Sequence, residues 1–263
     1  MGLTKKRDLA LALSGGSVRG LAHIGFLEVL EENNIKVDYI VGTSMGALVG
    51  GIYAVGKIKE FKKSILKLSK NKIMSLLLSD KIKKGNTDTK EIEKFIKKFI
   101  GDKKIENLNV GFTAIATDLK TGKEVYLEKG SLLKSISASI SIPGIFQPVK
   151  MRGMLLVDGG VLDPLPEEYA KGKARKVISV NALPMKISYK PGGGTFEILS
   201  EVGSIMINEI IGQRNGKEKD RLFIQIKTRN IDSFDFKSAS KVIELGRRAA
   251  RKNLRKIKKL VRN

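Results

Sequence analysis

Two glycine-containing turns, each set between an apolar run and a helical pattern, restrict the fold of this chain more than any other feature. The apolar run Asp8–Leu13 leads through the first turn into helical spacing over Val18–Glu32. The run Val37–Val41 leads through the second turn into a helix of small and apolar residues over Ser44–Val55. This order of strand, helix, strand, helix builds parallel strands joined by right-handed crossovers. We therefore predict a three-layer α/β/α sandwich with a mostly parallel central sheet.

Similar patterns continue towards the C-terminus. The expected strands are Val110–Ala116, Val125–Leu127, Met154–Val157, Lys176–Val180 and Leu222–Ile226, and the expected helices lie near Leu132–Ser139 and Phe196–Ile211. No internal repeat or Pro/Ser-rich linker interrupts the chain. We therefore expect residues 1–263 to form a single domain, with the motif-bearing core at about 8–182.

Two basic segments are expected to be amphipathic helices. The insertion at about 57–104 contains 16 Lys and six acidic residues, with apolar residues at helical spacing. The C-terminal segment at about 238–263 has the pattern of one long basic helix, whose apolar stripe forms a face to dock.

The composition excludes several classes of site. The chain has no Cys and one His, His23, so disulfides, thiolate metal sites, Cys nucleophiles and His-rich zinc sites are excluded. The longest uncharged stretch, Tyr39–Gly56, carries glycines and a Thr-Ser pair in its middle and is not expected to span a membrane. We expect a cytoplasmic protein that is peripheral at the inner membrane surface.

The second turn has the form Gly-x-Ser-x-Gly, with Gly42, Ser44 and Gly46 placed after a strand and before a helix. In this context the serine sits on a strained turn, exposed to substrate, with the positive end of a helix beside it. The simpler interpretation is an ordinary turn whose serine caps the helix. The pentapeptide alone leaves both interpretations open.

A serine nucleophile needs a base, and few candidates exist. His23 lies at the start of the first helix and precedes the serine, opposite to the order of an α/β-hydrolase, so we assign it a role in helix packing. The strongest carboxylate is Asp158, which ends an apolar strand and is followed by Gly159 and Gly160. Carboxyl ends of parallel strands share one edge of a sheet, so Asp158 is expected near Ser44. Its simpler interpretation is an Asp-Gly turn.

The first turn, Ser14–Gly20, has the composition of an anion-binding loop. Glycines at 15, 16 and 20 let consecutive backbone N–H groups point into one cavity at a helix N-terminus. A dinucleotide loop of the form Gly-x-Gly-x-x-Gly does not match, because Ser17 stands where glycine is required. The alternative is an oxyanion hole for a serine acyl enzyme, with Arg19 holding the loop.

Four separated stretches together resemble the patatin-like phospholipases of the small bacterial type. They are Ser14–Gly25, Gly42–Gly46, Ser139–Phe146 and Asp158–Val161. The resemblance implies a patatin-like fold, a Ser44–Asp158 catalytic dyad, and an oxyanion hole formed at Gly15, Gly16, Ser17 and Arg19. It also identifies as motif glycines Gly20, Gly42, Gly46, Gly159 and Gly160. The dyad supplies both nucleophile and base, so no metal and no cofactor are implied.

Two positions depart from the pattern of that family. Ser17 replaces a glycine, and a residue with a Cβ tolerates positive φ poorly. Asp163 replaces an asparagine and adds negative charge that could raise the pKa of Asp158.

The resemblance implies a serine lipid acyl hydrolase, a phospholipase A type esterase that works through an acyl enzyme. Two alternatives stay open: an acyltransferase that uses the same dyad, and a catalytically weak lipid-binding regulatory protein. The expected substrate is a lipid or another fatty-acyl ester. Which lipid is cut, at which acyl position, and in what oligomeric state are left open.

The charge of the chain suggests a surface partner. Its 50 Lys and Arg residues against 27 Asp and Glu give a net charge of +23. With ten Phe, five Tyr and no Trp, aromatic platforms for nucleic acid are scarce, so no nucleic acid partner is expected. One interpretation of this charge is that the basic amphipathic helices contact an anionic membrane surface. The simpler interpretation is that the lysine faces are only solvated.

Overall fold

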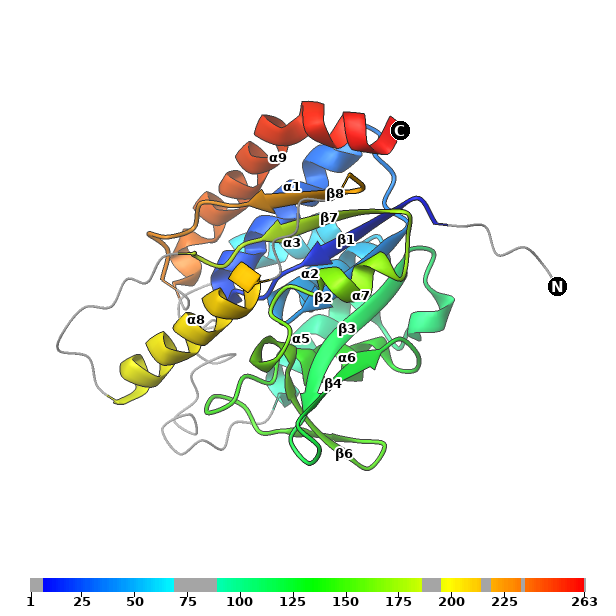
Figure 1. Cartoon of the computed structure of the whole chain (residues 1–263). Coiled ribbons are helices and arrows are strands. Elements are labelled where there is room, and N and C mark those ends of the chain that lie inside the picture. The colour runs from blue at the N-terminus through cyan, green and yellow to red at the C-terminus, as the bar shows by residue number, and fades with distance from the viewer. Residues whose placement is uncertain (1–6, 69–88, 186–194, 214–218, 233–234, 263) are drawn as a thin grey trace.

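The computed structural model describes residues 7–68, 89–185, 195–213, 219–232 and 235–262. The part of the basic insertion at 69–88 lies outside the described residues. Figure 1 shows a twisted central sheet with helices packed along it.

The sheet has eight strands in the order β5-β6-β3-β2-β1-β7-β8, with β4 paired to β3. The strands are β1 Leu9–Leu13, β2 Tyr39–Thr43, β3 Gly111–Asp118, β4 Lys123–Leu127, β5 Val149–Met151, β6 Met154–Asp158, β7 Lys176–Asn181 and β8 Arg221–Gln225. Strands β3, β2, β1, β7 and β8 are parallel, whereas β4, β5 and β6 pair antiparallel to their neighbours. The prediction of a mostly parallel sheet in an α/β fold is confirmed.

The helices follow the expected order. They are α1 Ala22–Glu32, α2 Met45–Ala54, α3 Ile58–Leu66, α5 Lys90–Ile100, α6 Leu132–Ser139, α7 Glu167–Lys171, α8 Thr195–Gln213 and α9 Ala239–Arg262. Short 3₁₀ turns are η1 Ser17–Leu21, η3 Ile105–Asn107, η4 Gly159–Val161 and η5 Phe236–Ser238. The predicted strands coincide with observed ones to within two residues at each end, and β5 and α7 were not predicted.

The sequence of β1 shows how the layers are built. Its leucines at 9, 11 and 13 belong to the larger core, which also contains apolar residues of α1, α2, α3, α5, α6 and α9. Its alanines at 10 and 12 face the opposite side, in a smaller core with residues of α7 and the end of α8. Side chains alternate across a strand, so this alternation of large and small residues gives the sheet one thick and one thin helical layer.

The C-terminal helix α9 is docked on α1, alongside which it runs in Figure 1. A Cβ on Gly25 would lie 1.9 Å from the Ile243 carbonyl oxygen, and one on Gly246 would lie 1.8 Å from that of Ala22. Only glycine allows the two helices to approach this closely. The apolar stripe expected as a docking face is therefore covered by the protein's own core, with Val242, Ile243, Ala250 and Ile257 buried.

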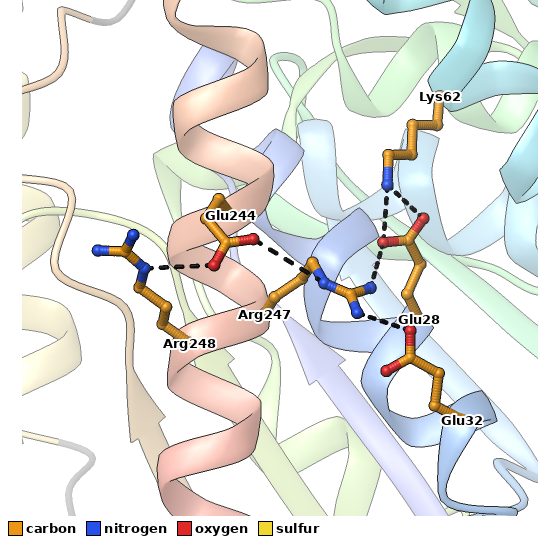
Figure 2. A network of polar contacts seen from close by, with 6 residues as sticks. All are labelled: Glu28, Glu32, Lys62, Glu244, Arg247 and Arg248. Atoms are coloured by element: carbon orange, nitrogen blue, oxygen red, sulfur yellow. Dashed lines mark hydrogen bonds and ion pairs between the residues drawn. The ribbon is translucent and has the colours of Figure 1, made fainter.

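A polar network at the edge of this contact joins three helices (Figure 2). The Arg247 guanidinium donates to Glu28 Oε2 at 2.8 Å and to Glu32 Oε1 at 2.6 Å, both on α1. Lys62 of α3 donates to Glu28 Oε1 at 2.7 Å. These contacts place α9 and α3 against the same turn of α1.

The helices of the basic insertion also turn their apolar faces inward. Ile58, Phe61 and Ile65 of α3 and Ile92 and Ile96 of α5 are buried in the larger core. For the described part of the insertion, the apolar stripe is thus unavailable to a membrane.

Candidate active site

Ser44 occupies a sharp turn between β2 and α2. Its backbone takes φ 56° and ψ −123°, a conformation that costs on the order of 1–3 kcal/mol for a residue with a Cβ. The side chain does not cap α2. The capping interpretation of this serine is therefore wrong, and its hydroxyl is directed elsewhere.

The Ser44 hydroxyl donates to a buried carboxylate. Ser44 Oγ lies 2.5 Å from Asp158 Oδ2, and the two residues are 7% and 5% exposed. The second oxygen, Asp158 Oδ1, accepts the Gly160 N–H at 2.7 Å. Asp158 thus forms the Asp-Gly turn that was its simpler interpretation, and it also accepts the hydrogen bond from Ser44.

Strand β6, which carries Asp158, runs antiparallel to β3, so the expectation of two parallel strands ending at one edge does not hold. Strand β3 pairs with β2 as far as Ile115 and with β6 from Ala116 onward. It continues past the end of β2, and β6 returns along this extension. The carboxyl ends of β2 and β6 therefore meet end to end on the same side of β3, from opposite directions.

Burial raises the pKa of Asp158 from 3.8 to about 6, while the hydrogen bonds from Ser44 and Gly160 oppose the rise. The effect of Asp163 on the pKa of Asp158 stays a prediction. The Asp163 carbonyl oxygen accepts a hydrogen bond from Thr43 Oγ1 at 2.7 Å.

The glycine loop lies directly against the serine. A Cβ on Gly15 would be 3.3 Å from Ser44 Cβ and 4.0 Å from Oγ. The Gly15 N–H donates to Pro164 O, and the Arg19 N–H donates to Gly16 O, both at 3.0 Å. Among the backbone hydrogen bonds of the described residues, none uses the N–H of Gly16 or Ser17.

Ser17 adopts a left-handed backbone conformation that glycine takes without strain. Its φ is +49°, and that of the preceding Gly16 is +130°. A left-handed conformation costs roughly 1–2 kcal/mol for a residue with a Cβ. The loop keeps this conformation in spite of the serine.

Arg19 and His23 hold the loop from outside. Arg19 Nε donates to Ile231 O at 2.8 Å, which ties the loop to the segment after β8. His23 is fully buried, and its Nε2 donates to Ser14 O at 2.9 Å. Burial lowers the pKa of His23 to about 4. His23 is thus neutral, and its ring bonds to the loop rather than to Ser44.

The remaining motif glycines allow close approaches between elements. Their added Cβ atoms would meet neighbours at 3.1 Å or less: Gly20 against Met45 Cβ, Gly42 against the Gly46 carbonyl, Gly46 against Leu13 O, Gly159 against Ile115 O and Gly160 against Asp158 Oδ1. Side chains at these positions would push apart the two loops and the strands that carry the dyad residues.

Residues 139–141 hold both halves of the site, a role that the sequence pattern did not predict. Ser139 Oγ accepts the Ser44 N–H at 2.9 Å. The Ser141 carbonyl oxygen accepts the Asp158 N–H, also at 2.9 Å. The conspicuous Ser-x-Ser spacing before Pro143 was the available signal, but only the folded chain shows what it bonds.

An apolar cavity of about 90 Å³ adjoins Ser44. Among the described residues that line it, Ser17 and Ser44 are polar and the others are apolar. Within the described residues, no group of three His, Asp or Glu side chains is arranged to hold a metal ion. None of the helices in the described part of the chain combines the length and apolarity needed to cross a bilayer.

Comparison with known proteins shows similarity along the stretch that carries this site. The sequence model described as patatin-like phospholipase matches residues 11–171. An uncharacterized NTE family protein of Mycobacterium tuberculosis is 42% identical over 158 residues, which cover 60% of this chain and 44% of that protein. Lysophospholipase NTE1 of Candida glabrata is 34% identical over 168 residues, which cover 60% of this chain and 9% of that protein. The chain thus spans less than half the length of these relatives.

Among solved structures, VipD from Legionella pneumophila has a similar fold, with a TM-score of 0.51 at 13% sequence identity. The match covers 96% of this chain and 67% of that one.

Proposed function

Because the chain belongs to the patatin-like phospholipase family, we propose that it hydrolyses fatty-acyl esters of lipids through a dyad of Ser44 and Asp158, as a phospholipase A type serine esterase. The observation that carries the proposal is the 2.5 Å hydrogen bond from Ser44 Oγ to the buried Asp158 carboxylate. The buried, neutral His23 bonds to Ser14, which leaves Asp158 as the base in contact with the nucleophile.

The first half of the reaction acylates Ser44. Asp158 accepts the hydroxyl proton as Ser44 Oγ forms a bond to the ester carbonyl carbon, and the carbonyl oxygen becomes an oxyanion. The N–H groups of Gly16 and Ser17, which donate to no backbone oxygen in the backbone hydrogen bonds described above, are the candidate donors to that oxyanion. When the intermediate collapses, the bond to the alcohol oxygen breaks and Asp158 returns its proton to the leaving alcohol.

The second half releases the fatty acid. Asp158 takes a proton from a water molecule, whose oxygen attacks the acyl carbonyl carbon. The bond to Ser44 Oγ then breaks, and Oγ recovers the proton from Asp158. An alcohol or lysolipid in place of water would complete an acyl transfer with the same residues.

The environment of Asp158 suits this role. A carboxylate with an ordinary pKa near 3.9 is a weak base at neutral pH. Burial raises the pKa of Asp158 to about 6, so it is a stronger base and still mostly ionised at neutral pH.

A test of the proposal measures fatty-acid release from diacyl and monoacyl phospholipids. Ser44→Ala and Asp158→Asn are expected to abolish release. Ser137→Ala is the matched control, because Ser137 is also buried but its Oγ donates to Leu133 O within α6. Release that persists in either dyad variant would refute the mechanism. A wild-type protein that transfers acyl groups to an added lysolipid without releasing fatty acid would instead be an acyltransferase.

We also propose peripheral contact with anionic membranes, through α9. Six basic residues share one exposed stripe on the side of α9 opposite to its buried face: Lys241, Arg248, Lys252, Arg255, Lys259 and Arg262. At a rise of about 1.5 Å per residue the stripe is about 31 Å long. Because the apolar face is used by α1, this contact would be electrostatic, without insertion into the bilayer.

Binding to vesicles of anionic and of neutral phospholipid tests this contact. The double variant Arg255→Glu, Lys259→Glu is expected to lose binding to anionic vesicles, and salt is expected to weaken wild-type binding. Unchanged binding in the variant would refute the role of the stripe. Hydrolysis of a soluble ester is the control for an intact active site.

A further inference from the structure

The apolar cavity beside Ser44 is walled by the basic insertion. Phe61 and Ile65 of α3 and Ile92, Phe95 and Ile96 of α5 line it, facing the start of α2 and Ser44. Long stretches of the insertion are charged, yet these side chains are apolar and point inward. The apolar face of the insertion helices thus lines a cavity inside the protein, next to the serine of the proposed reaction.

Three aromatic rings stiffen this wall. The ring centroid of Phe61 lies 6.2 Å from that of Phe95 and 5.3 Å from that of Phe99, and Phe95 and Phe99 are 5.3 Å apart. The two contacts of Phe99 are edge-on, a favourable arrangement for aromatic pairs. Phe61 and Phe95 line the cavity, whereas Phe99 packs behind them and is not a lining residue.

We infer that this cavity binds a single acyl chain and that Phe61 and Phe95 determine how long a chain it accepts. The inference rests on the proposed function, since Ser44 must hold the ester carbonyl. With the carbonyl at Ser44, the chain extends between α2 and the insertion helices. The described lining residues offer a headgroup almost no hydrogen-bond partner, so we place the headgroup outside the cavity.

The size of the cavity favours a chain-length limit. Its volume of about 90 Å³ is smaller than the roughly 150 Å³ apolar cavity that admits a benzene molecule. The cavity therefore holds only a short stretch of a single chain next to the ester carbonyl, and the rings of Phe61 and Phe95 limit how far that chain can extend. Each methylene that a hydrophobic pocket accepts or excludes changes kcat/KM about 10- to 200-fold. Removing one ring should therefore change the chain-length profile by at least tenfold.

The experiment measures kcat/KM for p-nitrophenyl esters whose acyl chains lengthen stepwise from acetate to palmitate. Phe61→Ala and Phe95→Ala are expected to raise the ratio of long-chain to short-chain kcat/KM at least tenfold. Ile65→Phe, which fills the cavity, is expected to lower the ratio. Phe99→Ala is the matched control, because it removes a ring from the same cluster without enlarging the lining, and its profile should match wild type.

Thermal unfolding establishes which variants are folded. Phe61 is fully buried, so Phe61→Leu accompanies Phe61→Ala as a milder change, and Phe95→Ala and Ile65→Phe test the inference independently. An active wild type whose profile is unchanged in the folded lining variants would overturn this inference and leave the proposed function standing. An equal shift in Phe99→Ala would also overturn it. A folded wild type that hydrolyses no ester of any length would overturn the proposed function, and this inference with it.

Discussion

The buried carboxylate of Asp158 predicts how the stability of the protein depends on pH. Burial raises the pKa of Asp158 above its value in the unfolded chain, so the folded state binds the proton more tightly. Asp158 therefore favours the folded state at low pH, and this contribution is lost as the pH rises through the folded pKa. Asp158→Asn removes the titration, and the variant should become more stable relative to wild type as the pH rises.

The magnitude follows from the pKa values. A rise from 3.8 to about 6 corresponds to roughly 3 kcal/mol of unfolding free energy, at about 1.36 kcal/mol per pKa unit. Asparagine keeps one acceptor oxygen for the two donors, Ser44 Oγ and Gly160 N–H, so the variant also loses about 1 kcal/mol of hydrogen bonding. That loss does not depend on pH and leaves the slope unchanged.

Urea unfolding of both proteins between about pH 4 and about pH 7 measures this difference. The free energy of unfolding of the variant minus that of wild type is expected to increase by roughly 2–3 kcal/mol across the range. In thermal unfolding, a change of 1 kcal/mol shifts the Tm of a chain of this size by about 2–4 °C. The difference in Tm between variant and wild type should therefore change by several degrees over the same pH range. A difference that is constant with pH, or that changes in the opposite direction, would refute a buried, raised-pKa carboxylate.

Three further predictions concern the reaction and the docking of α9. The kcat/KM for a soluble ester should rise with pH around a midpoint of about 6, because only ionised Asp158 accepts the Ser44 proton; a pH profile that is flat through this region would contradict its role as the base. Gly246→Ala should lower the free energy of unfolding by several kcal/mol, because its Cβ would lie 1.8 Å from Ala22 O. Gly203→Ala in α8 has open space around it and should not lower it. Equal effects of the two variants in denaturant unfolding would count against the close α1–α9 contact. Arg247→Ala should lower the free energy of unfolding by about 1–3 kcal/mol, because it removes a hydrogen bond to the mostly buried Glu28. Arg248 is the control: its side chain is 73% exposed, and Arg248→Ala should lower the free energy of unfolding by less than about 1 kcal/mol.

Much of the fold could be predicted from local patterns. The leucine and alanine alternation of β1 and the helical spacing after it depend on periods that a few residues reveal. Local patterns also identified the turn around Ser44 and the strand end at Asp158. They missed β5, which has three residues, and α7, which has five, because elements this short carry too little periodicity.

The direction of β6 could not be predicted in the same way. Its apolar residues suit a parallel or an antiparallel neighbour equally well, because alternation along a strand does not encode the direction of its partner. The pairing of Ala116 with Asp158 is what brings the carboxylate to Ser44, and it depends on a contact between residues far apart in the chain. The hydrogen bonds of residues 139–141 are of the same kind.

For the amphipathic helices too, the sequence determined one property and the tertiary structure another. The spacing of apolar residues determined that α3, α5 and α9 each have an apolar face, because that property belongs to a single helix. What covers each face is a property of two elements, and only the tertiary structure decided it. For α9 the cover is α1, through the approach at Gly25 and Gly246. For α3 and α5, apolar side chains beside Ser44 line the cavity that the described residues enclose.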